Sequence, residues 1–333
     1  MKKFIIITTI NKKTKAIKEF SKILKDWHII LVGDKKSRYI KSYKNITFLS
    51  IQDQEKLPFK TAKLCPYNHY ARKNIGYLYA IKNGADIIYD TDDDNIPYNN
   101  WKFPTFTKDS KIISSKEGYI NIYNNFTSEK IWPRGYPLEK INKIQTPKIK
   151  KSKDIKIGAW QGLADLDPDV DAIYRLLINK NIIFKKKSPI VLNKKTYCPF
   201  NSQNTLWNKE CFPYMYLPAS VSFRFTDILR GYIAQKLFWE DNFMLGFTKA
   251  TVYQERNKHN LMSDFASELD CYLHINNIVG IMNKQKLTQD KFKNLEIIYK
   301  ALLSNGYVEK LELQTLKAWT SDINNIYKEN KNG

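Results

Sequence analysis

The sequence predicts an α/β fold, with a mixed, mainly parallel sheet that carries helices on both faces. Along the first ninety residues, short β-branched apolar runs alternate with segments of helical periodicity, a pattern typical of strands buried between two helical layers. Of the 333 residues, 43% are hydrophobic, which is enough for a large core and excludes disorder as the main state. No apolar run approaches the ~20 residues that a membrane-spanning helix needs.

The first half opens with a strand, a helix and a second strand. In chain order, the predicted elements are a strand at 4–10, a helix at 15–25, a strand at 27–32, a strand at 46–51, a helix at 68–83 and a strand at 85–89. In the first helix, Ile17, Phe20 and Leu24 recur at helical spacing. Gly84 follows the second helix, as is typical just past a helix end.

The second half is less regular. Residues 101–220 are rich in Pro, Asn and aromatic side chains, which favours ordered loops and a binding surface. The basic stretch 148–156 predicts an exposed crossing or a mobile loop. A helix is expected from Asp227 to Phe238, and two amphipathic helices, at 289–304 and 308–328, close the chain.

Charge and cysteine content narrow the function classes. The chain has 55 Lys and Arg against 33 Asp and Glu, a net charge of +22. Only seven of the cations are Arg, and no segment combines Arg with aromatic residues as nucleic-acid readers do, so nucleic acid is a disfavoured partner. The charge reflects either a solvated lysine surface or attraction to an anionic membrane or polyanionic substrate. The four scattered cysteines argue against a disulfide frame or zinc site. The sequence thus predicts a cytoplasmic protein, free or peripheral on the inner face of the membrane.

An acidic cluster ends the predicted strand at 85–89. Asp90, Asp92, Asp93 and Asp94 place four carboxylates within five residues, and these would repel one another unless a cation compensates them. Asp90 and Asp92 would face the same side of a strand, about 6.6 Å apart. Their oxygens suit Mg²⁺ or Mn²⁺, which also bind diphosphates, so Asp90, Asp92 and Asp93 are the predicted metal ligands. The alternative is an acidic turn that caps the next segment.

A second group of residues is predicted to bind a nucleotide. Arg72 and Lys73 lie at the start of a helix, where free N–H groups and the helix dipole attract phosphate. Thr8 and Thr9 end the first strand and Asp34 follows the second, which is where a nucleoside rests in this topology. The alternatives are solvated surface cations for the first pair and a turn cap for Asp34.

Three downstream carboxylates are candidates for acceptor binding and catalysis. Asp169 and Asp171 follow a small-residue segment that contains Trp160, and such a mixture of flat apolar surface and acceptors suits a sugar. Asp227 opens a predicted helix, where it could deprotonate an acceptor hydroxyl. Helix capping explains each of these positions equally well.

Six collinear motifs resemble those of the STELLO family of glycosyltransferases. They are Phe48–Gln54, Pro66–Tyr77, Asp90-Thr91-Asp92-Asp93, Ile131–Glu139, Asp169-Val170-Asp171 and Asp227–Tyr232, and they cover about residues 48–256. The family is more distantly similar to the reversibly glycosylated polypeptides, which include UDP-arabinopyranose mutases. The resemblance implies a GT-A (Rossmann-like) fold, a UDP-sugar donor and Mn²⁺ or Mg²⁺ at the acidic cluster.

The resemblance also sets the expected organisation. It implies a glycosyltransferase-like domain at 1–256, with a nucleotide-binding half at 1–100 and an acceptor-binding half at 101–256, followed by a helical extension at 257–333. Plant members carry an N-terminal membrane anchor and reside in the Golgi, whereas this sequence opens on a strand, so we do not expect that location. Phe238 stands where processive synthases carry Arg, so a non-processive hexosyl- or pentosyltransferase is expected.

The expected reaction is transfer of a sugar from a UDP-sugar to a glycan, lipid-linked or other cell-surface acceptor, as in polysaccharide biosynthesis. Two alternatives stay open at this point. One is a UDP-sugar mutase or self-glycosylating protein, and the other is a non-catalytic nucleotide-sugar-binding scaffold of a polysaccharide synthase.

Overall fold

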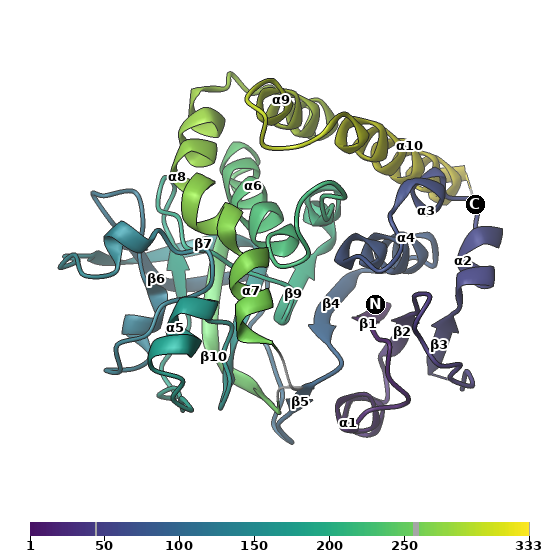
Figure 1. Ribbon diagram of the computed structural model, residues 1–333, viewed down its shortest axis with the longest axis horizontal. Coiled ribbons are helices and arrows are strands. Elements are labelled where there is room, and N and C mark those ends of the chain that lie inside the picture. Colours follow the sequence, from purple (N-terminus) through teal and green to yellow (C-terminus); the bar gives the residue numbers. More distant parts are fainter. Residues whose placement is uncertain (44, 256–259, 333) are drawn as a thin grey trace.

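Ten strands form one continuous sheet through the middle of the protein (Figure 1). The computed structural model describes residues 1–43, 45–255 and 260–332, with side chains described to residue 330. The strands are β1 (Lys3–Thr8), β2 (His28–Val32), β3 (Ile46–Leu49), β4 (Ile87–Asp92), β5 (Asn95–Pro97), β6 (Thr107–Ser114), β7 (Lys148–Asp165), β8 (Ile190–Leu192), β9 (Asn204–Asn208) and β10 (Met244–Gln254). Their order in the sheet is β3-β2-β1-β4-β9-β7-β6-β8-β10-β5, with a further pairing between β7 and β10.

Helices flank this sheet and close the chain. The α-helices are α1 (Lys15–Ile23), α2 (Ile51–Lys56), α3 (Lys60–Leu64), α4 (Lys73–Lys82), α5 (Ala172–Leu177), α6 (Thr226–Glu240), α7 (Leu261–Ser267), α8 (Leu269–Lys284), α9 (Lys291–Ser304) and α10 (Lys310–Asn332). Short 3₁₀ helices are η1 (Tyr70–Arg72), η2 (Ile122–Asn125), η3 (Leu138–Lys140) and η4 (Lys209–Met215). No helix in the described part of the chain is long and apolar enough to cross a bilayer.

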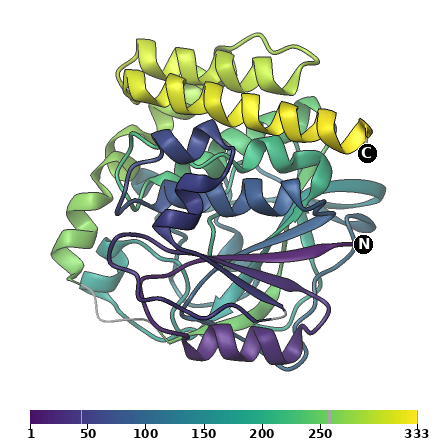
Figure 2. The same cartoon turned by 90° about the vertical axis from the view of Figure 1, so that its right-hand side faces the viewer.

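The first half matches the α/β prediction closely. Strands β3, β2, β1 and β4 are parallel neighbours, and alternate residues of β1 face opposite layers. Ile5 and Ile7 belong to the hydrophobic cluster that includes α1, and Ile6 belongs to the cluster that includes α4. Figure 2 shows α1 on one side of these strands and α4 on the other.

Close packing of α4 against the sheet sets the depth of the later site. A Cβ atom added at Gly76 would lie 2.6 Å from Val32 and 2.7 Å from Ile6, so only a residue without a side chain lets the helix approach this far. The approach brings the first turn of α4, which begins at Lys73, under the end of β4.

The second half departs from the predictions in two respects. The basic stretch 148–156, expected as a crossing or mobile loop, is the first part of the long strand β7, hydrogen-bonded to β6. Its exposed lysines hide the strand signal, because this part of β7 lacks the alternation of a half-buried strand. Strands β9, β7, β6, β8, β10 and β5 include antiparallel pairs, so the sheet is mixed, as expected, but the mainly parallel character that the sequence predicts holds only among β1–β4.

Helix α10 packs against α3 and α4 of the first half, although it is distant from them in sequence (Figures 1 and 2). The Asp322 carboxylate of α10 accepts hydrogen bonds from the backbone N–H groups of Lys60 and Thr61, at 3.0 and 2.8 Å, and so satisfies the start of α3. Trp319 is fully buried and donates from Nε1 to the Pro213 carbonyl. The predicted boundary between residues 256 and 257 lies outside the described residues.

Candidate functional site

A pocket of about 640 Å³ opens at the carboxyl ends of β1, β2 and β4, where ligands bind in open α/β sheets. Its wall combines residues of the first half with residues of the loops around β7 and of the start of α6. Among the predicted site residues, the pocket is lined by Thr8, Thr9, Asp34, Arg72, Asp92, Asp93, Asp169 and Asp227. Together with Arg134, these residues represent five of the six motifs, which the fold brings to one pocket.

The nucleotide side of the pocket is built from strand ends. Thr8 is paired in register with Val32 of β2 and with Asp92 of β4, so the three strand ends lie side by side. Asp34 lies at the rim, where its backbone N–H donates to Ser37 Oγ. The Ser37 hydroxyl in turn donates to the Thr9 carbonyl, which fixes the loop after β2 to the loop after β1.

Asp93 is held against the loop that follows β1. Its Oδ2 accepts from Thr9 Oγ1 at 2.5 Å and from Asn11 Nδ2 at 3.0 Å. The Thr14 hydroxyl, which caps α1, donates to the Asp93 carbonyl. One carboxylate oxygen of Asp93 is thus committed within the protein, and Asp93 as a whole remains on the pocket wall.

Asp90 and Asp92 share an internal cation. Lys73 is fully buried, and its Nζ lies 2.7 Å from Asp90 Oδ1 and 3.2 Å from Asp92 Oδ1. Burial opposes the charge of Lys73, but the two carboxylates outweigh it and raise its pKa. Lys73 therefore neutralises part of the carboxylate charge that, from the sequence, a bound metal was predicted to neutralise. It lies beneath the pocket rather than on its wall.

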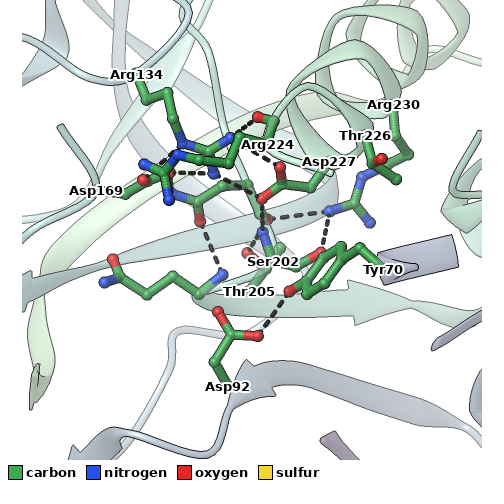
Figure 3. Close-up of polar contacts among 12 residues, drawn as sticks. Tyr70, Asp92, Arg134, Asp169, Ser202, Thr205, Arg224, Thr226, Asp227 and Arg230 are labelled. Atoms are coloured by element: carbon green, nitrogen blue, oxygen red, sulfur yellow. Dashed lines mark hydrogen bonds and ion pairs between the residues drawn. The ribbon is translucent and has the colours of Figure 1, made fainter. Parts of the chain in front are cut away.

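The two strand carboxylates differ in access. Asp90 is fully buried, whereas the Asp92 side chain is 33% exposed and faces the pocket. Tyr70 donates its hydroxyl to Asp92 Oδ1 at 2.6 Å (Figure 3). Removal of Asp92 from bulk water raises its pKa, and the charge of Lys73 opposes that rise.

Arg72, predicted to bind phosphate, is committed to protein acceptors. It is almost fully buried and donates from Nε and Nη2 to Gln54 Oε1 and from Nη1 to the Cys65 carbonyl. Gln54 itself donates to the carbonyls of Gly33 and Leu49. In this arrangement Arg72 supports the loop that carries Asp34 from below.

Arg134 joins two of the candidate catalytic carboxylates. Its Nε and Nη2 lie 2.8 Å from the two oxygens of Asp169, and its Nη1 and Nη2 lie 3.1 Å from those of Asp227 (Figure 3). Burial disfavours the ionised Asp169, but the guanidinium outweighs it, so the pKa of Asp169 lies below its usual value. Asn201 Nδ2 also donates to Asp169, at 2.6 Å.

Arg230 connects the two halves of the site. It lies one turn after Asp227 on α6, and its Nη1 is 3.5 Å from Asp90 Oδ2. Its Nη2 donates to Ser202 Oγ at 2.8 Å, while the Ser202 backbone N–H donates to Asp227 at 3.2 Å. Polar contacts therefore link Asp90 of β4, through Arg230, Ser202 and Asp227, to Arg134. Figure 3 shows the part of this chain from Arg230 to Arg134.

Asp171 lies apart from this chain of contacts. It is fully buried and caps α5, accepting from the backbone N–H of Tyr174 at 2.8 Å and from Trp132 Nε1 at 2.6 Å. Burial raises the pKa of Asp171 to about 6. Asp171 thus stabilises the start of α5, next to Asp169, and does not line the pocket.

The residues at the acidic cluster can hold a divalent ion only with help from a ligand. No group of three or more His, Cys, Asp or Glu side chains is placed to hold a metal within residues 1–43, 45–255 and 260–332. Asp90 is turned into the core, which leaves Asp92 and Asp93 on the pocket wall. Mg²⁺ commonly binds through one or two carboxylates together with substrate phosphates and waters, so this pair fits such an ion when a diphosphate is present.

Several residues that line the pocket were not predicted as site residues from the sequence. They are Lys36, Tyr70, Arg134, Gln203, Arg224 and Gln254. Tyr70 and Arg134 stand inside the motifs quoted above, but nothing local marks their chemistry. The spacing of Asp227 and Arg230, three residues apart on one helix, is a local signal from which a shared helix face can be predicted.

Comparison with known proteins gives two similar proteins, both described as probable glycosyltransferases. No protein-family model matches the chain. "Probable glycosyltransferase STELLO1" of Arabidopsis thaliana is 27% identical over 349 residues, covering 96% of this chain and 44% of that protein. "Probable glycosyltransferase STELLO2" of the same plant is 27% identical over 347 residues, with the same coverages. The chain therefore spans less than half the length of these curated relatives.

Among solved structures, one described as "Crystal Structure of a Mycobacterial Protein" is similar with a TM-score of 0.37 and 9% identity, covering 81% of this chain and 72% of that one. The two STELLO proteins, by contrast, align with the chain well beyond the region of the six motifs. The resemblance expected from those motifs is confirmed: the chain is similar to the two STELLO proteins over 96% of its length.

Proposed function

We propose that this chain is a metal-dependent glycosyltransferase with a GT-A arrangement, which transfers a sugar from a UDP-sugar to a glycan or lipid-linked acceptor. The observation that carries the proposal is the single pocket that unites the acidic end of β4 with the Arg134, Asp169 and Asp227 cluster. The names of the relatives, which are described as probable glycosyltransferases, support the same class of reaction.

The strand-end wall is proposed to hold the nucleotide. Thr8, Thr9 and Asp34 offer hydroxyl and carboxylate groups to a ribose or base at the ends of β1 and β2. Lys36 also lines the pocket and supplies a cation that can reach a phosphate. Arg72 acts indirectly, since its donors hold Gln54 and the Cys65 carbonyl.

Asp92 and Asp93 are the proposed metal-binding pair. When bound, Mn²⁺ or Mg²⁺ would offset the negative charge that develops on the departing UDP. Lys73 orients Asp92 from below and pairs with Asp90 in the core. Asp90 is therefore proposed as a positioning residue rather than a ligand.

The Arg134 cluster is proposed to bind the transferred sugar and the acceptor. Asp227 lies at the start of α6 and on the pocket wall, so it is the proposed base for an acceptor hydroxyl. Asp169, held ionised by Arg134, is suited to accept hydrogen bonds from sugar hydroxyls. Phe223 is half exposed beside these groups and offers a flat apolar face to a sugar ring.

The test is UDP release from a panel of UDP-sugars, with Mn²⁺ or with a chelator, in the presence and absence of acceptor saccharides. Turnover that requires the metal and falls by about 10²-fold or more in Asp92→Asn is expected, since a group acting on transition-state charge is lost. Asp270→Asn is the matched control and should leave the rate unchanged, because this α8 side chain is 45% exposed and lies outside the pocket. Equal turnover with chelator and in Asp92→Asn would contradict the metal assignment.

The same experiment separates the alternatives. UDP release that is accompanied by a gain of one sugar in the intact mass of the protein would indicate self-glycosylation. Tight UDP binding without release of any sugar would indicate a scaffold.

A further inference from the structure

A group of exposed lysines lies on β6, on the first part of β7 and on the segment before β8, and none of them lines the pocket. We define the basic ribbon as residues 107–114 of β6, residues 148–156 of β7 and the segment 185–188 that leads into β8. Its exposed lysines on the two strands are Lys111, Lys148, Lys150, Lys151, Lys153 and Lys156. Residues 185–187 add three consecutive exposed lysines.

Strand register brings the lysines of β6 and β7 together on one exposed two-stranded segment, with side chains on both of its faces. Lys111 of β6 lies directly opposite Lys151 of β7 in the antiparallel ladder, so both side chains point to the same face. Ser110 Oγ donates to the Pro189 carbonyl at 3.4 Å, and Lys111 is paired with Ile190, which ties the segment 185–188 to the same strand.

Carboxylates are scarce within the basic ribbon. Its carboxylates are Asp109 and Asp154, and Asp109 accepts the backbone N–H of Asp154 at 3.0 Å. None of the exposed lysines defined above forms an ion pair within the part of the chain that the structure describes. Like charges directly opposite each other destabilise a strand pair. An external polyanion would relieve that repulsion.

Apolar side chains stand exposed among these lysines. Ile149 lies between Lys148 and Lys150 and is 51% exposed, and Ile144, just before β7, is 93% exposed. The ribbon contains no Arg. Lysines mixed with exposed aliphatic residues suit the headgroup region of a bilayer, where cations meet phosphates and short apolar side chains enter the interface. Nucleic acid would instead favour Arg and aromatic residues.

We propose that the basic ribbon docks the protein on an anionic bilayer surface. The lysine ammonium groups bind lipid phosphates and carboxylates, and Ile144 and Ile149 insert at the level of the headgroups. The contact is peripheral and electrostatic, so it weakens as ionic strength rises. It concerns a surface separate from the pocket and does not depend on the proposed transferase activity.

The test is co-sedimentation of the full chain with vesicles of phosphatidylcholine that contain phosphatidylserine, compared with vesicles of phosphatidylcholine alone. Binding to the anionic vesicles only, lost at high salt, is expected. Lys150→Glu combined with Lys151→Glu should weaken this binding at least about tenfold, because each lysine near the surface contributes. Glu at position 151 faces Lys111, which replaces a repulsion with an attraction and keeps the strand pair intact.

The matched control makes the same change of net charge elsewhere. Lys310→Glu combined with Lys328→Glu alters two exposed residues of α10 and should leave vesicle binding within about twofold, since distant exposed charges are screened. Ile144→Ser should weaken binding about two- to threefold without changing its salt dependence.

Three results would overturn the proposal: equal binding to both kinds of vesicle, equal losses in the ribbon variant and the α10 control, or salt-dependent binding to RNA or DNA duplexes with none to vesicles. A thermal unfolding scan of each variant confirms that the comparison is made on folded protein.

Discussion

The ammonium group of Lys73 lies 2.7 Å from the Asp90 carboxylate, and both side chains are fully buried. Lys73 comes from the first turn of α4 and Asp90 from the buried part of β4, so the ion pair fastens the helix to the strand beneath the pocket. Arg230 of α6 approaches the same carboxylate from the other half of the chain. Asp90 is therefore central to the fold of the site, whereas Asp92, two residues later, faces the ligand space.

Substitution of Asp90 and Asp92 by Asn should separate these two roles. Asp90→Asn leaves the buried Lys73 and Arg230 short of a counter-charge, so we expect a loss of about 3 kcal/mol or more in the free energy of unfolding. Asp92→Asn should lower stability by about 1 kcal/mol and act mainly on UDP release. Urea unfolding of both variants checks this, and equal losses of stability would contradict the assignment.

Arg134→Lys should damage both stability and turnover. A single ammonium cannot present two parallel N–H donors to Asp169 while also reaching Asp227, as the guanidinium does. We expect about 2–4 kcal/mol less stability, because buried carboxylates lose a partner, and at least about a 10²-fold fall in kcat from misplaced groups.

UDP binding supplies the control for that variant. Arg134 contacts the Asp169 and Asp227 side of the pocket, so the affinity for UDP alone, measured by calorimetry, should change little in Arg134→Lys. A parallel loss of UDP affinity and kcat would show that the cluster instead belongs to the nucleotide subsite.

Asp171 should give a specific pH dependence. Its pKa in the folded protein is about 6, above the ordinary value of 3.8, so the folded state retains a proton that the unfolded state releases. Its contribution to stability is therefore full below pH 3.8 and is lost as the pH rises to about 6. At about 1.4 kcal/mol per pKa unit, the loss is up to about 3 kcal/mol.

Asp171→Asn isolates this contribution. The amide oxygen can still cap α5, and no proton is exchanged at that position. The difference in unfolding free energy between the native protein and the variant, measured in urea from pH 4 to pH 7, should move in favour of the variant as the pH rises. A difference independent of pH would contradict the raised pKa.

Two helical glycines predict opposite responses to Ala. A Cβ at Gly231 in α6 would lie 2.3 Å from the Phe200 carbonyl oxygen, which is backbone and cannot move aside, so Gly231→Ala should lower stability by about 2 kcal/mol or more. Gly280 in α8 has no atom within 4 Å of that position, and Gly280→Ala should raise stability by about 0.5–1 kcal/mol. Thermal unfolding of both variants measures the contrast, and changes of the same sign would refute the packing argument.

The sequence predicted the first half of the fold well, because its signals are local. Buried strands such as β1 are continuous β-branched runs, and α1 shows helical periodicity that neighbouring segments lack. Strand β7 was missed over 148–156 because its lysines are exposed and it is stabilised by pairing with β6, an interaction between residues about forty positions apart.

In the candidate site, too, the sequence predicted residues from local signals but not the distant residues that they contact. Asp92 and Asp93 were candidates because several carboxylates lie together at a strand end. Asp169 and Asp227 were candidates because they lie near predicted helix starts. Their final partners could not be read locally, since Arg134 meets Asp227 across 93 positions and Arg230 meets Asp90 across 140.

By itself, the sequence determined the α/β class, the acidic strand end and the likeness to STELLO proteins, because composition, periodicity and short motifs are properties of neighbouring residues. Only the tertiary structure decided that Lys73 pairs with Asp90 beneath the pocket and that Arg72 donates to Gln54. It also decided that Asp171 caps α5 and accepts from Trp132 instead of lining the pocket. The physical reason is that burial and the choice of charge partner depend on which distant segments meet, and a buried charge takes the nearest compensating group that the fold supplies.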